Sequence, residues 1–204
     1  MPVKETTVEI KLKNLKTNLE YLKSKITSKT KFMAVVKAFS YGSDSRVVSQ
    51  ELERLGVDYL AVAYTQEGID LRKFGIKIPI LVLHPQEKDF DNIIENQLEP
   101  SIYSFRILSF FFKTLKIKNK KSYPYHIKFN TGLNRLGFLK KDIHKLSELI
   151  KPNLPKYIFS HLGASEDLDE KEYTKKQIEE FISIDRDLEI KLKASLKKHL
   201  LNTS

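Results

Sequence analysis

The sequence contains no cysteine, which excludes both a disulfide framework and a thiolate metal site. It also has no apolar run approaching the roughly 20 residues that cross a bilayer. The first residues, MPVKETTVEIKLKNLK, lack the apolar core of a signal peptide. We therefore expect a cytoplasmic protein of 204 residues that binds no metal and is not associated with a membrane.

The sequence has fewer acidic residues (26) than basic residues (36), and the formal net charge is +10. A basic balance of this size raises the question of nucleic-acid binding. However, the lysines are scattered over helical segments and mixed with acids, and the densest run, residues 116–121, falls between elements. Aromatic residues for base stacking are missing from that run. We expect no nucleic-acid partner, although the charge suits an anionic small molecule.

Short apolar runs alternate with amphipathic segments along most of the chain. The runs are almost continuously apolar, which is typical of parallel strands whose two faces are both covered by helices. The expected strands are residues 32–38, 58–63, 78–84, 98–104, 123–130, 156–164 and 199–204. Helical spacing is clearest in residues 46–56, 65–75, 140–150 and 171–184.

Several helix ends are marked by capping residues. Thr65 is expected to be an N-cap, and Asp169 with Glu172 forms a capping pattern. Gly56 and Gly75 are expected to end their helices.

Repeated strand–helix units build either a doubly wound sheet or a (β/α)8 barrel. The sequence holds neither G-x-G-x-x-G nor G-x-x-x-x-G-K-[ST], the phosphate fingerprints of open-sheet families, so the α/β TIM-barrel type is favoured. We expect residues 31–204 to form this barrel and residues 1–30 to be a leading strand and helix packed outside it. Only seven repeat strands are visible, and we expect the chain to stop before the eighth.

Polar residues stand at or just beyond the ends of the expected strands, where barrel enzymes carry their active sites. Each alone is as well explained by a structural or solvent-exposed role, but together they predict a ring of functional groups. They are Lys37, Tyr41, His84, Lys128, Arg135, His161, Asn202 and Thr203.

These residue types fit one cofactor in particular. The amine of Lys37 can form a Schiff base with an aldehyde. Arg135 can donate a hydrogen bond to a ring nitrogen, and the hydroxyls of Tyr41 and Thr203 can bind a phosphate. The set predicts a site for pyridoxal 5′-phosphate.

Four motifs in order resemble the alanine racemase family. AVVKAFSYGSDS is similar to the lysine motif AVVKA-x-AYG, and HIKFNTGLNRLGF resembles H-x-K-x-DTGM-x-RLG. FSHLGAS and HLLNTS resemble the two strands that follow. The stretches AFSYGS and DYLAVAYTQEG look most similar to the racemase half of a fusion with a muramoyl-tripeptide:D-alanyl-D-alanine ligase.

The resemblance implies a fold-type III enzyme that interconverts L- and D-alanine for peptidoglycan synthesis and works as a homodimer. Lys37 would carry the cofactor and exchange the α-proton on the D-alanine side. Arg135 would face the pyridine nitrogen, supported by His161. The remaining roles fall to Tyr41, Asn202 and Thr203, which would bind the cofactor, and to Lys128, which matches a lysine often carbamylated in the family.

The sequence departs from the family pattern at Asn130, where aspartate is usual, and at Thr203, where serine is usual. We expect the chain to lack the eighth strand and the C-terminal β domain, which supplies a tyrosine base in the family. The resemblance therefore implies the N-terminal cofactor-binding part, with weak or no activity alone. Two alternatives stay open: a non-catalytic pyridoxal-phosphate homeostasis protein and an inactive racemase fragment.

Overall fold

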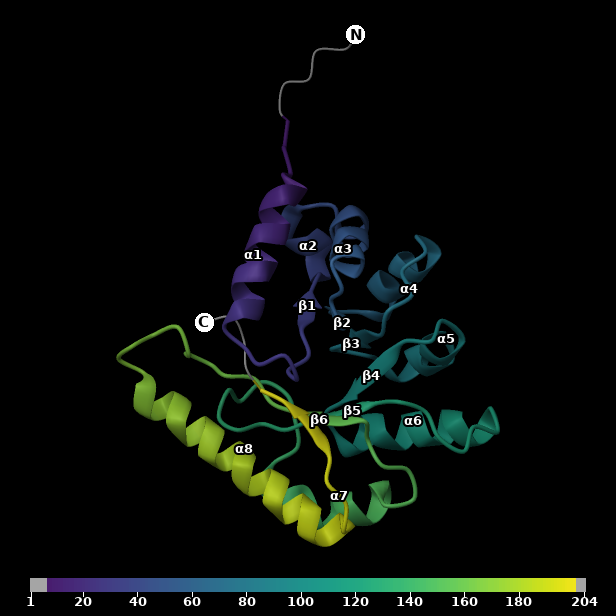
Figure 1. Ribbon diagram of the computed structural model, residues 1–204. Coiled ribbons are helices and arrows are strands. Elements are labelled where there is room, and N and C mark those ends of the chain that lie inside the picture. Colours follow the sequence, from purple (N-terminus) through teal and green to yellow (C-terminus); the bar gives the residue numbers. More distant parts are fainter. Residues whose placement is uncertain (1–6, 201–204) are drawn as a thin grey trace. The chain divides into compact units, whose positions relative to one another are not determined.

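The computed structural model describes residues 7–200 of the chain. It divides into two compact units, residues 1–81 and 82–204, which are described in turn. Seven strands lie within the described residues, and every pairing recorded between them is parallel. Figure 1 shows the strands alternating with helices along the chain, which is the expected strand–helix repeat.

The first unit contains β1 (Met33–Val35), β2 (Tyr59–Val62) and the start of β3 (Ile80–Val82). Met33 pairs with Tyr59 and Val35 with Ala61. The N–H of Leu60 donates to the carbonyl of Pro79 at 3.0 Å, which joins β2 to the segment before β3. The helices of this unit are α1 (Leu12–Ser24), α2 (Lys37–Gly42), α3 (Ser45–Arg54) and α4 (Thr65–Lys73).

The second unit contains β4 (Glu99–Ile102), β5 (His126–Lys128), β6 (Tyr157–Phe159) and β7 (Lys197–His199), paired in that order. Its α-helices are α5 (Phe90–Glu95), α6 (Phe105–Ile117), α7 (Ile143–Ile150) and α8 (Lys171–Leu192). Two 3-10 turns, η1 (Glu87–Asp89) and η2 (Lys140–Asp142), lead into α5 and α7. Figure 1 shows α7 and α8 packed beside each other.

Burial explains why these segments form central strands. Every residue of β2, β3, β4, β5 and β6 is buried, as expected for parallel strands covered on both faces. In contrast, β1 and β7 are only partly buried. A cluster of aromatic rings fills part of the second unit, where Phe111 lies 5.1 Å from Tyr125 and 5.3 Å from Phe90 between ring centroids.

Several local expectations need correction. Thr65 is the first residue of α4 and not its cap, because Tyr64 has the extended backbone of an N-cap. Asp169 does not cap α8 either, since the residue before that helix is Glu170 and its side chain makes no capping bond. Residues 7–11, the described part of the expected leading strand, form no strand. The last strand begins at Lys197, two residues earlier than expected.

Candidate active-site residues

The end of β1 leads directly into Lys37. Val36 is buried and its N–H donates to the carbonyl of Ala61 at 2.9 Å, so the backbone is fixed up to that point. Lys37 follows with a half-buried side chain. Its Nζ lies 5.9 Å from the centroid of the Tyr41 ring, so the structure brings these two predicted residues together.

The turn after Lys37 has an unusual backbone. Ala38, Phe39, Ser40 and Tyr41 all have φ between 51° and 58°, which makes α2 left-handed over four successive non-glycine residues. A left-handed conformation costs an L-residue about 1–2 kcal/mol. Four in succession therefore cost roughly 4–8 kcal/mol, and such strain persists only where surrounding contacts determine the conformation.

Glu67 of α4 supplies such contacts, and the sequence analysis did not identify it as a site residue. One carboxylate oxygen accepts the N–H of Ala38 at 2.8 Å. The other accepts the N–H groups of Ala63 and Tyr64 at 2.7 and 3.1 Å. A glutamate at the third helical position after an N-cap, as Glu67 follows Tyr64, is a sequence signal for the bond to the N-cap backbone. No feature of the sequence near Glu67 indicates its bond to Ala38.

Lys128 ends β5 and is 7% exposed. Its Nζ lies 5.8 Å from the centroid of the Phe159 ring on the neighbouring strand. On the same face of β5, two residues earlier, is His126. The predicted lysine is thus held inside the second unit and not on its surface.

Arg135 lies on an exposed loop whose backbone is closely held. The side-chain oxygen of Asn130 accepts the N–H groups of Gly132 and Asn134 at 3.1 and 3.0 Å, and its amide nitrogen donates to the side-chain oxygen of Asn134 at 3.1 Å. Gly137 closes the loop at φ +128°, where a Cβ would lie 2.5 Å from the backbone of Phe129. These contacts fix the segment that carries the guanidinium.

His161 follows β6 and is exposed, while its backbone is held by α8. The side chain of Gln177, which is fully buried, donates to the carbonyl of His161 at 3.3 Å and accepts the N–H of Gly163 at 2.8 Å. A Cβ on Gly132 or on Gly163 would lie 3.3 Å or less from side chains of α8. The loops carrying Arg135 and His161 therefore pack against the same helix.

A chain of ionisable groups crosses the strands of the second unit. His126 bonds Glu99 at 2.9 Å through Nε2 and His199 at 3.1 Å through Nδ1, and Lys156 lies 2.7 Å from the other oxygen of Glu99. Burial opposes the charged form of Glu99, yet its hydrogen bonds from His126 and Lys156 hold the carboxyl pKa below its usual value. Burial lowers the pKa of His126, and burial with the nearby His126 lowers the pKa of His199 to about 3. Both histidines are thus neutral, and His126 donates to an ionised Glu99.

The other predicted positions are less informative. His84 stacks on Tyr103, with ring centroids 5.3 Å apart. Asn202 and Thr203 lie outside the described residues. No cluster of histidine and carboxylate side chains suited to a metal ion occurs within residues 7–200. Over the same span, no helix has both the length and the apolar character required to cross a membrane.

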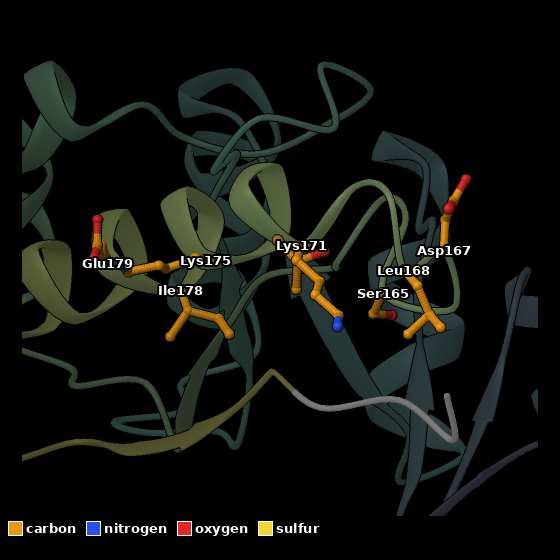
Figure 2. A pocket seen from close by; sticks show the side chains of 8 residues that line it. Ser165, Asp167, Leu168, Lys171, Lys175, Ile178 and Glu179 are labelled. Atoms are coloured by element: carbon orange, nitrogen blue, oxygen red, sulfur yellow. The ribbon is translucent and has the colours of Figure 1, made fainter.

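A pocket of about 280 Å³ lies along the loop after β6 and the first half of α8. Figure 2 shows Ser165, Leu168 and Lys171 at one end of it and Ile178 with Glu179 at the other. None of the residues predicted as functional lines this pocket. It is therefore separate from the predicted groups.

Comparison with known proteins identifies the family. The profile described as "Alanine racemase, N-terminal domain" matches residues 10–204. The chain belongs to the alanine racemase family. It is 31% identical to alanine racemase 1 of Caldanaerobacter subterraneus subsp. tengcongensis over 99% of this chain and 53% of that protein. The chain thus spans about half the length of the alanine racemases it matches.

Solved structures agree on the fold. An alanine racemase of Clostridium difficile 630 superposes with a TM-score of 0.88 at 31% identity, covering 94% of this chain and 54% of that one. An alanine racemase of Bartonella henselae, solved with covalently bound pyridoxal phosphate, gives 0.83 at 26% identity over 95% of this chain and 55% of its own. The barrel-type α/β fold expected from the sequence is that of the alanine racemase N-terminal domain.

Proposed function

We propose that this chain is the cofactor-binding part of a pyridoxal-phosphate-dependent alanine racemase, with Lys37 as the residue that carries the cofactor. The observation that carries the proposal is the half-buried side chain of Lys37, placed just after a parallel strand at the start of a strained backbone turn that Glu67 contacts. Support comes from the family and from the relative whose structure contains covalently bound pyridoxal phosphate.

The residues present fit this cofactor chemically. Lys37 forms no ion pair within residues 7–200, so its amine is not committed to a carboxylate. Nearby, Tyr41 is 69% exposed, which leaves its ring accessible to a ligand. A primary amine beside an aromatic hydroxyl suits an aromatic aldehyde that carries a phosphate.

When bound, pyridoxal phosphate supplies an electron-accepting system that makes the α-proton of an amino acid removable. We assign to Lys37 Nζ the covalent bond to the cofactor and the proton on the D-alanine side. Arg135 would hold the pyridine nitrogen of the cofactor by a hydrogen bond, and His161 would support that arginine. These assignments follow the motifs AVVKAFSYGSDS, HIKFNTGLNRLGF and FSHLGAS.

Further assignments concern binding and modification. Tyr41 and Thr203 would bind the phosphate by their hydroxyls, and Asn202, which precedes Thr203 in the motif HLLNTS, would also bind the cofactor. Lys128 is the lysine we expect to be carbamylated, because it is buried and stands at the position that matches the family motif. The substrate is alanine, the complete enzyme is a cytoplasmic homodimer, and its product serves peptidoglycan synthesis.

The test is α-proton exchange in deuterium oxide. The chain is incubated with pyridoxal phosphate and either D- or L-alanine, and deuterium at the α-carbon is measured by mass spectrometry. We expect exchange of D-alanine to exceed that of L-alanine, because Lys37 serves only one face. Binding of the cofactor without exchange of either substrate would instead support a non-catalytic pyridoxal-phosphate-binding protein or an inactive fragment.

Two variants make the result specific. Lys37→Arg should abolish exchange, because a guanidinium does not form the bond to the aldehyde. Lys25→Arg is the matched control, since Lys25 Nζ also lies over a tyrosine ring, 4.9 Å from the centroid of Tyr21. Equal exchange by wild type and Lys37→Arg would contradict the proposal.

A further inference from the structure

The conformation of the turn after Lys37 needs an explanation, because its own residues do not favour it. Alanine, phenylalanine, serine and tyrosine all carry a Cβ, and each is disfavoured at positive φ. At the two ends of the turn, Ser40 N–H donates to the carbonyl of Val36 at 3.2 Å and Ser43 N–H donates to the carbonyl of Ser40 at 3.4 Å. Because four such residues follow one another, contacts from outside the turn are expected to help hold it.

A short hydrogen bond to the turn comes from Glu67. Its carboxylate accepts the N–H of Ala38, the residue directly after Lys37 and the first in the left-handed stretch, at 2.8 Å. Hydrogen bonds to a charged acceptor are stronger than those between neutral groups. Glu67 thus holds Ala38, the residue at which φ changes from negative to positive.

The same carboxylate is itself immobilised. Its second oxygen accepts two N–H groups just beyond the end of β2, those of Ala63 and Tyr64, at 2.7 and 3.1 Å. Glu67 therefore joins the turn of Lys37 to the end of the neighbouring strand, and β1 and β2 are themselves paired. A shift of Ala38 would have to break this bridge.

We propose that Glu67 is a positioning residue for Lys37: by holding Ala38 in the left-handed conformation, it sets the direction in which the amine of Lys37 leaves β1. This inference rests on the proposed function, which gives the amine its cofactor. Glu67 does not contact the cofactor itself in this account. Its effect passes through the backbone of Ala38.

The experiment measures the affinity of the full chain for pyridoxal phosphate by absorbance titration, together with the fraction of Lys37 labelled after borohydride reduction. Glu67→Ala should weaken cofactor binding by about tenfold or more and reduce labelling at Lys37. Glu67→Gln should also weaken it, because one amide oxygen cannot serve both ends of the bridge.

Glu53 provides a matched control in the same unit. One of its carboxylate oxygens accepts the N–H groups of Lys77 and Ile78 at 2.8 and 2.9 Å, so it makes the same kind of bond without touching the turn of Lys37. Glu53→Ala should leave cofactor affinity within about twofold of wild type. Far-ultraviolet circular dichroism establishes that each variant is folded.

A rescue separates positioning from general stabilisation. Glycine reaches positive φ without the Cβ penalty, so Ala38→Gly should restore much of the affinity lost in Glu67→Ala. Hydrogen exchange at Ala38 N–H, measured without cofactor, should be faster in Glu67→Ala and unchanged in Glu53→Ala.

The outcomes are distinct. A folded Glu67→Ala variant with wild-type affinity, or a loss that Ala38→Gly does not restore, would overturn the inference. If the wild-type chain is not labelled at Lys37, the proposed function fails. In that case, unchanged exchange at Ala38 N–H in Glu67→Ala would also overturn the role of Glu67, and faster exchange would preserve it.

Discussion

Asn130 is the residue at which the sequence departs most visibly from the family motif, and its contacts explain why asparagine works there. Its side-chain oxygen accepts two backbone N–H groups, and this function needs only an acceptor. Aspartate provides the same acceptor. The amide nitrogen of Asn130, which aspartate lacks, donates to the side-chain oxygen of Asn134. Asparagine in place of aspartate therefore has a hydrogen-bond acceptor within the same loop.

This leads to a prediction for two substitutions at Asn130. Asn130→Asp should change the free energy of unfolding by less than about 0.5 kcal/mol, because Asn134 can turn its amide and donate to the new carboxylate. In contrast, Asn130→Ala should cost about 1–3 kcal/mol, because two N–H groups lose their acceptor. Urea denaturation of both variants measures these changes. A large loss of stability in Asn130→Asp would contradict the prediction.

Lys37 could be proposed as a site residue from the sequence, because its chemistry and its place at the end of a strand are visible there, and its role stays a prediction. Glu67 and Gln177 could not, because each acts on a segment distant along the chain: Glu67 on Ala38, and Gln177 on His161 and Gly163. Glutamate and glutamine are ordinary residues at their positions in α4 and α8, so the helix pattern does not single them out. Only the three-dimensional contacts reveal their role.

At the scale of elements, the strands were the most predictable parts because continuous apolar runs are required when both faces are buried. The helix caps were less predictable, since Tyr64 replaces Thr65 at the start of α4. The left-handed turn of α2 could not be expected from the sequence, because residues 38–41 are alanine, phenylalanine, serine and tyrosine, and none of these favours positive φ. α6 was missed because its apolar residues, such as the partly exposed Phe110, also lie outside the buried face.

The packing of α8 against two loops makes a prediction at this scale. Gln177→Leu keeps the side-chain volume but removes both hydrogen bonds to the loop after β6. We expect faster amide hydrogen exchange in peptides covering 130–137 and 161–166, because both loops pack on this helix. Exchange mass spectrometry is the measurement.

The control for Gln177→Leu is Ile184→Val, a change at a fully buried residue further along the same helix. It should cost about 0.5–1.5 kcal/mol of stability without affecting the two loops. If both variants change loop exchange equally, general destabilisation and not Gln177 would be responsible.

For the whole molecule, the buried histidine pair makes stability depend on pH. The folded pKa values of His126 and His199 lie below the usual value of about 6.5, so the unfolded state binds protons that the folded state does not. Stability is therefore complete above about pH 6.5 and falls as the pH is lowered. For His199 the slope approaches about 1.4 kcal/mol per pH unit between about pH 5.5 and its folded pKa of about 3, and His126 adds a loss in the same direction.

Urea denaturation at pH 7.5, 6.5 and 5.5 tests this dependence. His199→Gln should reduce the slope between pH 6.5 and 5.5, because it removes one titrating group while its amide can still donate to His126. Glu99 adds a loss in the same direction only below about pH 4.5, since its folded pKa is also lowered. Equal stability at pH 7.5 and 5.5 would contradict the neutral state of both histidines.

Covalent trapping measures whether Lys37 binds an aldehyde cofactor. The full chain is incubated with pyridoxal phosphate, reduced with borohydride, and digested, and the modified lysines are mapped by mass spectrometry. We predict one adduct per chain, at Lys37. Adducts scattered over surface lysines, or none, would contradict the claim and leave the chain with the family's fold but without its cofactor site.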